Sequence, residues 1–446
     1  MKIAVFTVWA LAAASIAAVI VVGIGKIKGS DPGALPTAQG AEKSVTITQE
    51  EITALLDEHG RALTGRDEKA FTAPFAGAAK ASQRTLFKNL LKIPFQTTSF
   101  KVISSGGRAS DTFGRGATIN VDVAFVHQIK GVDVRPVAEW YRWTVEKKPK
   151  GRPTVTKVSG SPNAYGESKF VFYPGPWDVY SDMHVEKRPH VLITTHAKNA
   201  AIARRTADVF ERAAADDLNA WRRYGPRDGV TLPGFLIALE PDRKVYNTLF
   251  RVALKNDPNE AGFALAMYTF TDDLDDGLPI GGARIAIDTT ASRAGLPGGL
   301  PYARDVARHE IAHAMVDPLQ KPRSSLSSRP ATWVVEGFAD YMAGRGLPRR
   351  QQDALDAVRG RPFDGHLPLD FSFYADDGRA RAANYALGTL AMRFMAAKWG
   401  DKAVMSLVAA HYAEPGRLHK QIEQATGLSF EAFERQWAAY VRSRIR

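Results

Sequence analysis

The stretch ARHEIAHAMVD contains the pattern H-E-x-x-H, which can carry metal chemistry. It places His309 and His313 four positions apart, with Glu310 directly after the first histidine. Residues four apart on a helix project from one face, about one turn apart, so both imidazoles can bind a single Zn²⁺ at about 2 Å. Glu310 is rotated by about 100° from His309 and can act as a general base without being a ligand. The pattern therefore predicts zinc-assisted hydrolysis.

A second stretch, TWVVEGFADYMAG, predicts a helix over residues 332–344 that supplies a third ligand. It is mostly apolar, yet Glu336 and Asp340 lie four apart on one face. Burying two neighbouring carboxylates is costly unless a cation or hydrogen-bond donors are close. We therefore expect Glu336 to bind the zinc, and Asp340 to accept a hydrogen bond from the free ring nitrogen of a zinc-bound histidine. The alternative is that both carboxylates point to solvent.

Taken together, HEIAH and EGFAD, with 22 residues between His313 and Glu336, resemble the gluzincin metallopeptidases such as thermolysin and the zinc aminopeptidases. The form W-x-x-E-G-x-A-D is most similar to the peptidase MA-type domains of exported bacterial proteins. The resemblance implies one Zn²⁺ per chain, bound by His309 and by those two residues, with Glu310 as the base. It also implies a thermolysin-like fold for residues 175–446.

A tyrosine is implied by the same resemblance. In the zinc aminopeptidases a tyrosine opens a helix after the third ligand, with a small residue three positions later, and stabilises the oxyanion of the intermediate. Tyr385 and Gly388 fit that arrangement in NYALGTLAMRFMAAKWG. The alternative is that Tyr385 is a core residue without a catalytic role.

One motif of the zinc aminopeptidases, G-x-M-E-N, has no counterpart in this chain. Residues 281–288, GGARIAID, stand where that strand would be and lack the glutamate that holds the free amine of the substrate. An endopeptidase, or a peptidase of unknown specificity, is therefore favoured over an aminopeptidase. The strand at 281–288 can still pair with an extended peptide through its backbone.

Composition narrows the classes of site and partner. The chain of 446 residues has no cysteine, so any metal must be held by His, Asp or Glu. A purely structural zinc site is disfavoured, because such sites have four protein ligands, commonly cysteines. The net charge is +12, but Lys and Arg are scattered without an aromatic-interleaved basic motif. We therefore expect no nucleic-acid partner.

The N-terminus indicates a membrane location. Residues 3–25 contain no charged side chain, and about 20 apolar residues suffice to span a bilayer as a helix. The following KIKGSDPG is a poor signal-peptide cleavage site. We predict a single-pass anchor at 1–28, a flexible linker at 29–44, and a body outside the cytoplasm. The alternative is a cleaved signal and a secreted protein.

The elements that must position the zinc ligands form two units. In residues 45–165, amphipathic helices precede long alternating strands, which predicts an α+β unit. The stretch ALTGRDEKAF followed by these strands resembles the cone-shaped fold of the nuclear-transport-factor and ketosteroid-isomerase superfamily. The resemblance implies a ligand pocket inside the cone. The alternative is a binding module or spacer without chemistry. YPGPWD, residues 173–178, marks the boundary. Beyond it, residues 175–446 predict a mixed sheet followed by a mainly helical lobe, and we expect them to fold alone.

These observations predict a membrane-anchored zinc metallopeptidase outside the cytoplasm, with a peptide or protein substrate and the membrane as partners. The alternative is a membrane-anchored ligand-binding protein whose metallopeptidase-like scaffold is catalytically inactive. Neither the substrate nor the oligomeric state can be predicted from these residues.

Overall fold

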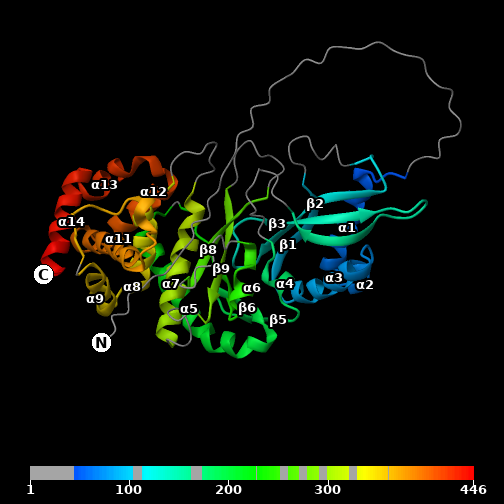
Figure 1. Ribbon diagram of the computed structural model, residues 1–446, viewed down its shortest axis with the longest axis horizontal. Helices are drawn as coiled ribbons and strands as arrows, with labels where there is room; N and C mark the ends of the chain where they lie inside the picture. Colours follow the sequence, from blue (N-terminus) through cyan, green and yellow to red (C-terminus); the bar gives the residue numbers. More distant parts are fainter. Residues whose placement is uncertain are drawn as a thin grey trace, which may run out of the picture.

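Three regions follow one another along the longest axis of the molecule: a four-stranded unit, a five-stranded sheet and a helical lobe (Figure 1). The computed structural model describes residues 45–103, 113–161, 173–227, 229–251, 260–270, 279–290, 299–320, 329–359 and 361–445. The predicted anchor and linker lie outside these ranges. Within them, no helix has the length and apolar character needed to cross a membrane. The architecture confirms the predicted α+β class.

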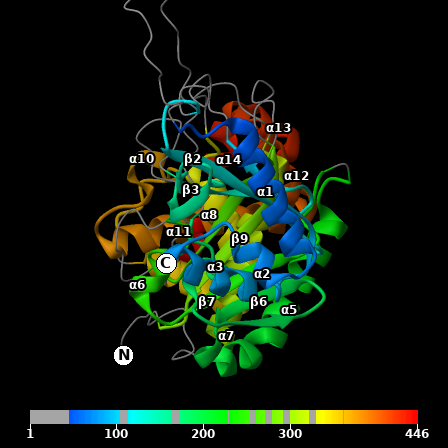
Figure 2. The ribbon, with the colours of Figure 1, turned by 90° about the vertical axis from the view of Figure 1, so that its right-hand side faces the viewer.

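The first unit packs three helices against an antiparallel sheet of order β1-β2-β3-β4. Its elements are α1 (Gln49–Thr64), α2 (Glu68–Thr72), α3 (Gly77–Leu90), β1 (Phe95–Val102), β2 (Thr118–Ile129), β3 (Val137–Glu146) and β4 (Thr154–Gly160). Thr48 and Glu51 form a capping box at the start of α1, which satisfies orphan backbone N–H groups there. Seen from this end of the molecule, α1–α3 lie in front (Figure 2).

The five-stranded sheet has the order β5-β6-β7-β9-β8. Its strands and their connections are α4 (Pro176–Val179), β5 (Met183–Lys187), β6 (Val191–His196), η1 (Ala197–Asn199), α5 (Ala200–Tyr224), β7 (Phe235–Glu240), α6 (Arg243–Tyr246), η2 (Leu249–Arg251), β8 (Gly262–Tyr268) and β9 (Ile280–Asp288). The central pairs β6–β7 and β7–β9 are parallel, and the outer pairs β5–β6 and β8–β9 are antiparallel.

The position of β9 corrects one expectation. Strand β9 contains the GGARIAID stretch and pairs with β7 on one side and β8 on the other. Both of its edges are therefore occupied, and it cannot receive an extended peptide. The outer strand on this side of the sheet is β8. Its edge position could not be predicted, because it depends on the order of the strands in the tertiary structure.

Both faces of the five-stranded sheet are buried, which is why its strands read as continuous apolar runs. Ile237 packs into the core beneath α5 and the following helices. Its neighbour Leu236, on the opposite face, belongs with Leu192 and Trp177 to the core of the first unit. The two units therefore share one hydrophobic core across their boundary.

The helical lobe follows β9 and begins with the helix that carries H-E-x-x-H. Its elements are α7 (Leu300–Val316), η4 (Asp317–Leu319), α8 (Thr332–Gly344), α9 (Pro348–Val358), α10 (Asp370–Phe373), α11 (Gly378–Trp399), α12 (Asp401–Ala413), η5 (Pro415–Arg417), α13 (Leu418–Thr426) and α14 (Phe430–Ile445). The predicted helix at 332–344 coincides with α8. Tyr385, expected at the start of a helix, instead lies in the second turn of α11.

Candidate metal centre

Two helices bring three ligand atoms of the kind that bind zinc to one buried point. His309 and His313 on α7 and Glu336 on α8 form a group that could hold a metal ion. The two Nε2 atoms are 3.0 Å apart, and Glu336 Oε2 lies 3.4 Å from that of His309 and 3.5 Å from that of His313. Ligand atoms around a tetrahedral zinc, with bonds of about 2.05 Å, are separated by about 3.3 Å. The spacing therefore fits a single ion.

A hydrogen bond on the far side of the ring orients His309 toward that point. His309 Nδ1 lies 3.0 Å from Asp340 Oδ1, so a proton on Nδ1 leaves the lone pair of Nε2 facing the group. The hydroxyl of Thr389 lies 3.4 Å from Asp340 Oδ2 and 2.9 Å from the carbonyl oxygen of Tyr385, to which it donates. The predicted proximity of Asp340 to a histidine of the group is thus present in the structure.

Tyr374 is a contact that sequence reasoning missed. Its hydroxyl donates to Glu336 Oε1 over 2.8 Å, which leaves Oε2 facing the histidines. Tyr374 follows the short helix α10 and lies 38 positions from Glu336. A tyrosine in such a connection has no periodic pattern that would single it out.

The electrostatics of the group favour a cation. Burial tends to raise the pKa of Glu336, but His313 and His309 outweigh it and lower the pKa to about 2. Burial tends to lower the pKa of His309, but the hydrogen bonds with Asp340 and Glu336 raise it to about 10, so the imidazole carries a second proton that a metal ion would displace on binding. The carboxylate of Glu336 is therefore held in the ionised form that binds metals.

Glu310 lies beside the group but is not one of its three members. It is fully buried, and neither carboxyl oxygen has a hydrogen-bond partner among the described residues. Burial raises its pKa well above the usual range, and the carboxylate of Glu336 adds to that effect. Its side chain faces Gly262, the first residue of β8. A Cβ placed on Gly262 would lie only 3.1 Å from Glu310 Cγ. A buried acid with a perturbed pKa and no hydrogen-bond partner is a candidate for proton transfer at a functional site.

Tyr385 also turns toward the histidines. Its ring centroid is 6.5 Å from that of His309, and its buried hydroxyl has no hydrogen-bond partner among the described residues. This position comes from a close contact between α8 and α11, where Gly337 and Gly388 meet. A Cβ on Gly337 would lie 2.5 Å from the carbonyl carbon of Gly388. The predicted importance of a small residue at 388 therefore has a packing reason.

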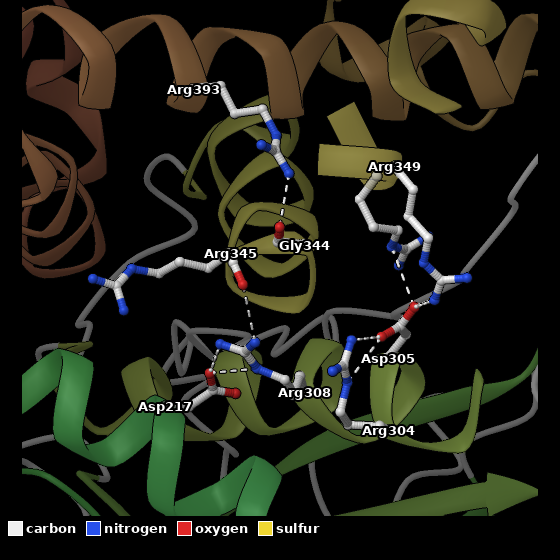
Figure 3. A network of polar contacts seen from close by, with 9 residues as sticks. Asp217, Arg304, Asp305, Arg308, Gly344, Arg345, Arg349 and Arg393 are labelled. Atoms are coloured by element: carbon white, nitrogen blue, oxygen red, sulfur yellow. Dashed lines mark hydrogen bonds and ion pairs between the residues drawn. The ribbon is translucent and has the colours of Figure 1, made fainter. Parts of the chain in front are cut away.

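Contacts between arginines and buried acids hold α7 in place (Figure 3). Arg308, next to His309, donates twice to Asp217 Oδ1 on α5, at 2.6 and 2.9 Å. One turn earlier, Arg304 and Arg349 contact the buried Asp305. These contacts fix α7 against α5 and the start of α9.

Comparison with known proteins adds no assignment, because neither a protein-family model nor a curated protein matches the sequence. What the geometry establishes is a buried His-His-Glu group able to hold a metal ion, within an α+β fold.

Proposed function

We propose that the chain is a zinc-dependent metallopeptidase of the gluzincin type that hydrolyses peptide bonds. The observation that carries this proposal is the buried group of His309, His313 and Glu336 with the unpartnered carboxyl of Glu310 beside it. Two imidazoles and one carboxylate are the ligand set of several catalytic zinc sites, which keep a further position open. The mixed sheet that precedes α7, and the helical lobe after it, support a thermolysin-like fold.

In the proposed reaction each described residue has one task. His309, His313 and Glu336 would hold a zinc ion, which would supply Lewis-acid activation of water and of the substrate carbonyl. Glu310 takes the proton of the attacking water and passes it to the leaving amine. The hydroxyl of Tyr385 donates to the oxygen on which negative charge develops. Asp340 keeps His309 in the tautomer that binds the metal.

The substrate of the proposed reaction is an extended peptide. Strand β8 lies at the edge of the sheet and starts beside Glu310. A peptide can add to such an edge through backbone hydrogen bonds. Pairing with β8 brings one of its peptide bonds to the metal group.

The proposed location and further partners rest on the sequence. The uncharged segment at 3–25 anchors the protein in a membrane, with the catalytic part outside the cytoplasm. A nuclear-transport-factor-like role for the first unit, as a binding module or spacer, is supported by its three helices packed on an antiparallel sheet. No nucleic-acid partner is proposed.

The test combines metal content with cleavage of a peptide library, read by mass spectrometry. We expect about one zinc per chain and cleaved peptides for the wild type. His313→Ala and Glu336→Ala should lose the metal, whereas Glu310→Gln should keep it and lose cleavage. His419→Ala, an exposed histidine on α13, is the matched control and should behave as wild type.

Two outcomes would overturn the proposal. Full zinc occupancy after His313→Ala and Glu336→Ala would show that the metal is bound elsewhere. Zinc bound by the wild type without cleavage of any peptide would favour the alternative, a ligand-binding protein on an inactive metallopeptidase-like scaffold.

A further inference from the structure

Strand β8 has one end at the candidate active site and the other at the first unit. Its first residue, Gly262, faces Glu310, with a built Cβ 3.2 Å from Glu310 Oε1. Strand β9 pairs with one edge of β8. In the described part of the chain, no strand pairs with the opposite edge between Gly262 and Met267. The edge of β8 opposite β9 therefore runs from the candidate active site to the end of β8 that lies beside the first unit.

The far end of this edge is occupied by the first unit. The N–H of Thr269 donates to Pro279 O over 2.8 Å, on the side of β9, and the N–H of Phe270 donates to Pro136 O over 3.1 Å. Consecutive N–H groups of an extended chain point to opposite edges, so Pro136 lies on the outer edge. Val137, the first residue of β3, makes an antiparallel bridge with Thr269. A peptide that pairs along β8 would meet Pro136 and Val137.

Pro136 and Val137, which would stop a peptide that pairs along β8, belong to a firmly held segment. Asp133, just before it, makes a bidentate contact with Arg284 of β9 at 2.6 and 3.0 Å, and both side chains are fully inaccessible to solvent. The N–H groups of Val134 and Arg135 donate to Gly281 O over 2.8 and 3.2 Å. Breaking such a buried ion pair by removing one partner is strongly destabilising. A substrate strand does not displace this segment.

We propose that the first unit limits the length of substrate on the N-terminal side of the cleaved bond to about six residues. This inference rests on the proposed peptidase function. Antiparallel pairing is the more stable mode per residue, and it directs the N-terminal part of the substrate from Gly262 toward Thr269. Seven steps of about 3.4 Å separate these two residues, or about 24 Å. The first unit thereby acts as a specificity element of the active site.

The test uses two series of internally quenched peptides built around one bond cleaved in the library, with the full-length, zinc-loaded protein. One series is lengthened only on the N-terminal side of that bond and the other only on the C-terminal side, in steps of two residues. We expect kcat/KM to fall at least tenfold once more than about six residues precede the bond. The C-terminal series should change less than twofold.

A matched pair of variants tests the stop itself. Phe270→Pro removes the N–H that bonds to Pro136, whereas Phe270→Ala keeps it. We expect Phe270→Pro to weaken the penalty for long N-terminal extensions at least threefold, and Phe270→Ala to retain it. Both should bind zinc and cleave the shortest peptide as the wild type does. If Phe270→Pro does not fold, the wild-type length series alone decides the question.

The outcomes separate this inference from the function on which it rests. Cleavage that is indifferent to N-terminal length, or limited on the C-terminal side instead, overturns the length limit and leaves the peptidase standing. Zinc binding without any cleavage overturns both.

Discussion

The orientation of Glu336 is fixed from two sides, because its two carboxylate oxygens have different partners. Oε1 accepts the hydroxyl of Tyr374, and Oε2 lies within 3.5 Å of both histidine Nε2 atoms. The hydrogen bond from Tyr374 thus selects which oxygen faces the ion. Contacts that orient a metal ligand contribute to the metal affinity of the site, yet they are easy to overlook in a sequence.

Tyr374→Phe should weaken zinc binding about 10–100-fold, because Glu336 loses the contact that holds its rotamer. Competition with a chelator measures the affinity, and circular dichroism shows that the fold is retained. Tyr385→Phe is the comparison, since it should keep the zinc affinity and slow hydrolysis about 10²–10³-fold. Equal zinc affinity in Tyr374→Phe and wild type would show that Glu336 is held by its packing alone.

Asp340 provides a graded test of the same idea. Its Oδ1 pairs with His309 Nδ1. Asp340→Asn keeps an acceptor but loses the charge, so it should weaken zinc binding less than Asp340→Ala, which we expect to lose about 10–100-fold. Isothermal titration with zinc ranks the three proteins. Normal zinc binding and turnover in both variants would mean that Asp340 is only a neighbouring carboxylate.

Among the elements, the packing of α8 on α11 decides whether Glu336 and Tyr385 face the same point. The two helices approach so closely that a Cβ on Gly388 would lie 2.8 Å from Trp333 O. Only glycine fits on both sides of this contact, although alanine is the better helix former. The two glycines therefore lower the helix propensity of α8 and α11 but allow the close approach that the geometry of the site requires.

Gly337→Ala should lower the free energy of unfolding by about 1–3 kcal/mol, because the new methyl group forces α8 away from α11. It should also weaken zinc binding, since Glu336 is the preceding residue. Gly378→Ala, at the start of α11 with nothing within 4 Å of its Cβ position, is the control and should be neutral. Urea unfolding compares the three proteins, and an undisturbed Gly337→Ala would contradict the close contact.

The ion pair between α5 and α7 predicts a pH dependence of stability. Asp217 is fully buried, its Oδ2 has no hydrogen-bond partner among the described residues, and burial raises its pKa from 3.8 to about 7 despite Arg308. Between about pH 4 and pH 7 the folded chain holds a proton that the unfolded chain has released. The free energy of unfolding therefore falls as the pH rises through this window, by up to about 4 kcal/mol.

Asp217→Asn cannot titrate, so its stability should fall less steeply than that of the wild type between pH 4 and pH 7. Urea unfolding at several pH values gives the two slopes. Identical slopes for wild type and Asp217→Asn would show that Asp217 stays ionised beside Arg308.

At the scale of the whole molecule, the two units depend on each other. Trp177, in the predicted boundary segment, and Leu236, well beyond it, both belong to the core of the first unit. Asn89 on α3 donates to the carbonyls of Trp177 and Tyr180 over 3.0 and 2.6 Å. Arg284, buried in the five-stranded sheet, has its carboxylate partner in the first unit. Removing the first unit exposes apolar surface and leaves a buried charge unpaired.

We therefore expect residues 175–446 alone to be insoluble or molten, the reverse of the expectation from the linker-like YPGPWD sequence. An unpaired Arg284 alone costs about 3–5 kcal/mol, a large part of the stability of a domain. Near-ultraviolet circular dichroism compares this fragment with residues 45–446, which should show fixed tertiary packing. A fragment with native-like spectra and a cooperative transition would show that the shared core is dispensable.

The sequence by itself determined the features whose geometry is local. Four-residue spacing on a helix places His309 beside His313, a capping box starts α1, and acids on an apolar helix mark α8, because helical periodicity relates near neighbours directly. Only the tertiary structure decided which strand lies at the edge, that Tyr374 supports Glu336, and that the two units share a core. Asp133 and Arg284 are 151 positions apart, and such contacts form only when strand order and packing bring distant segments together.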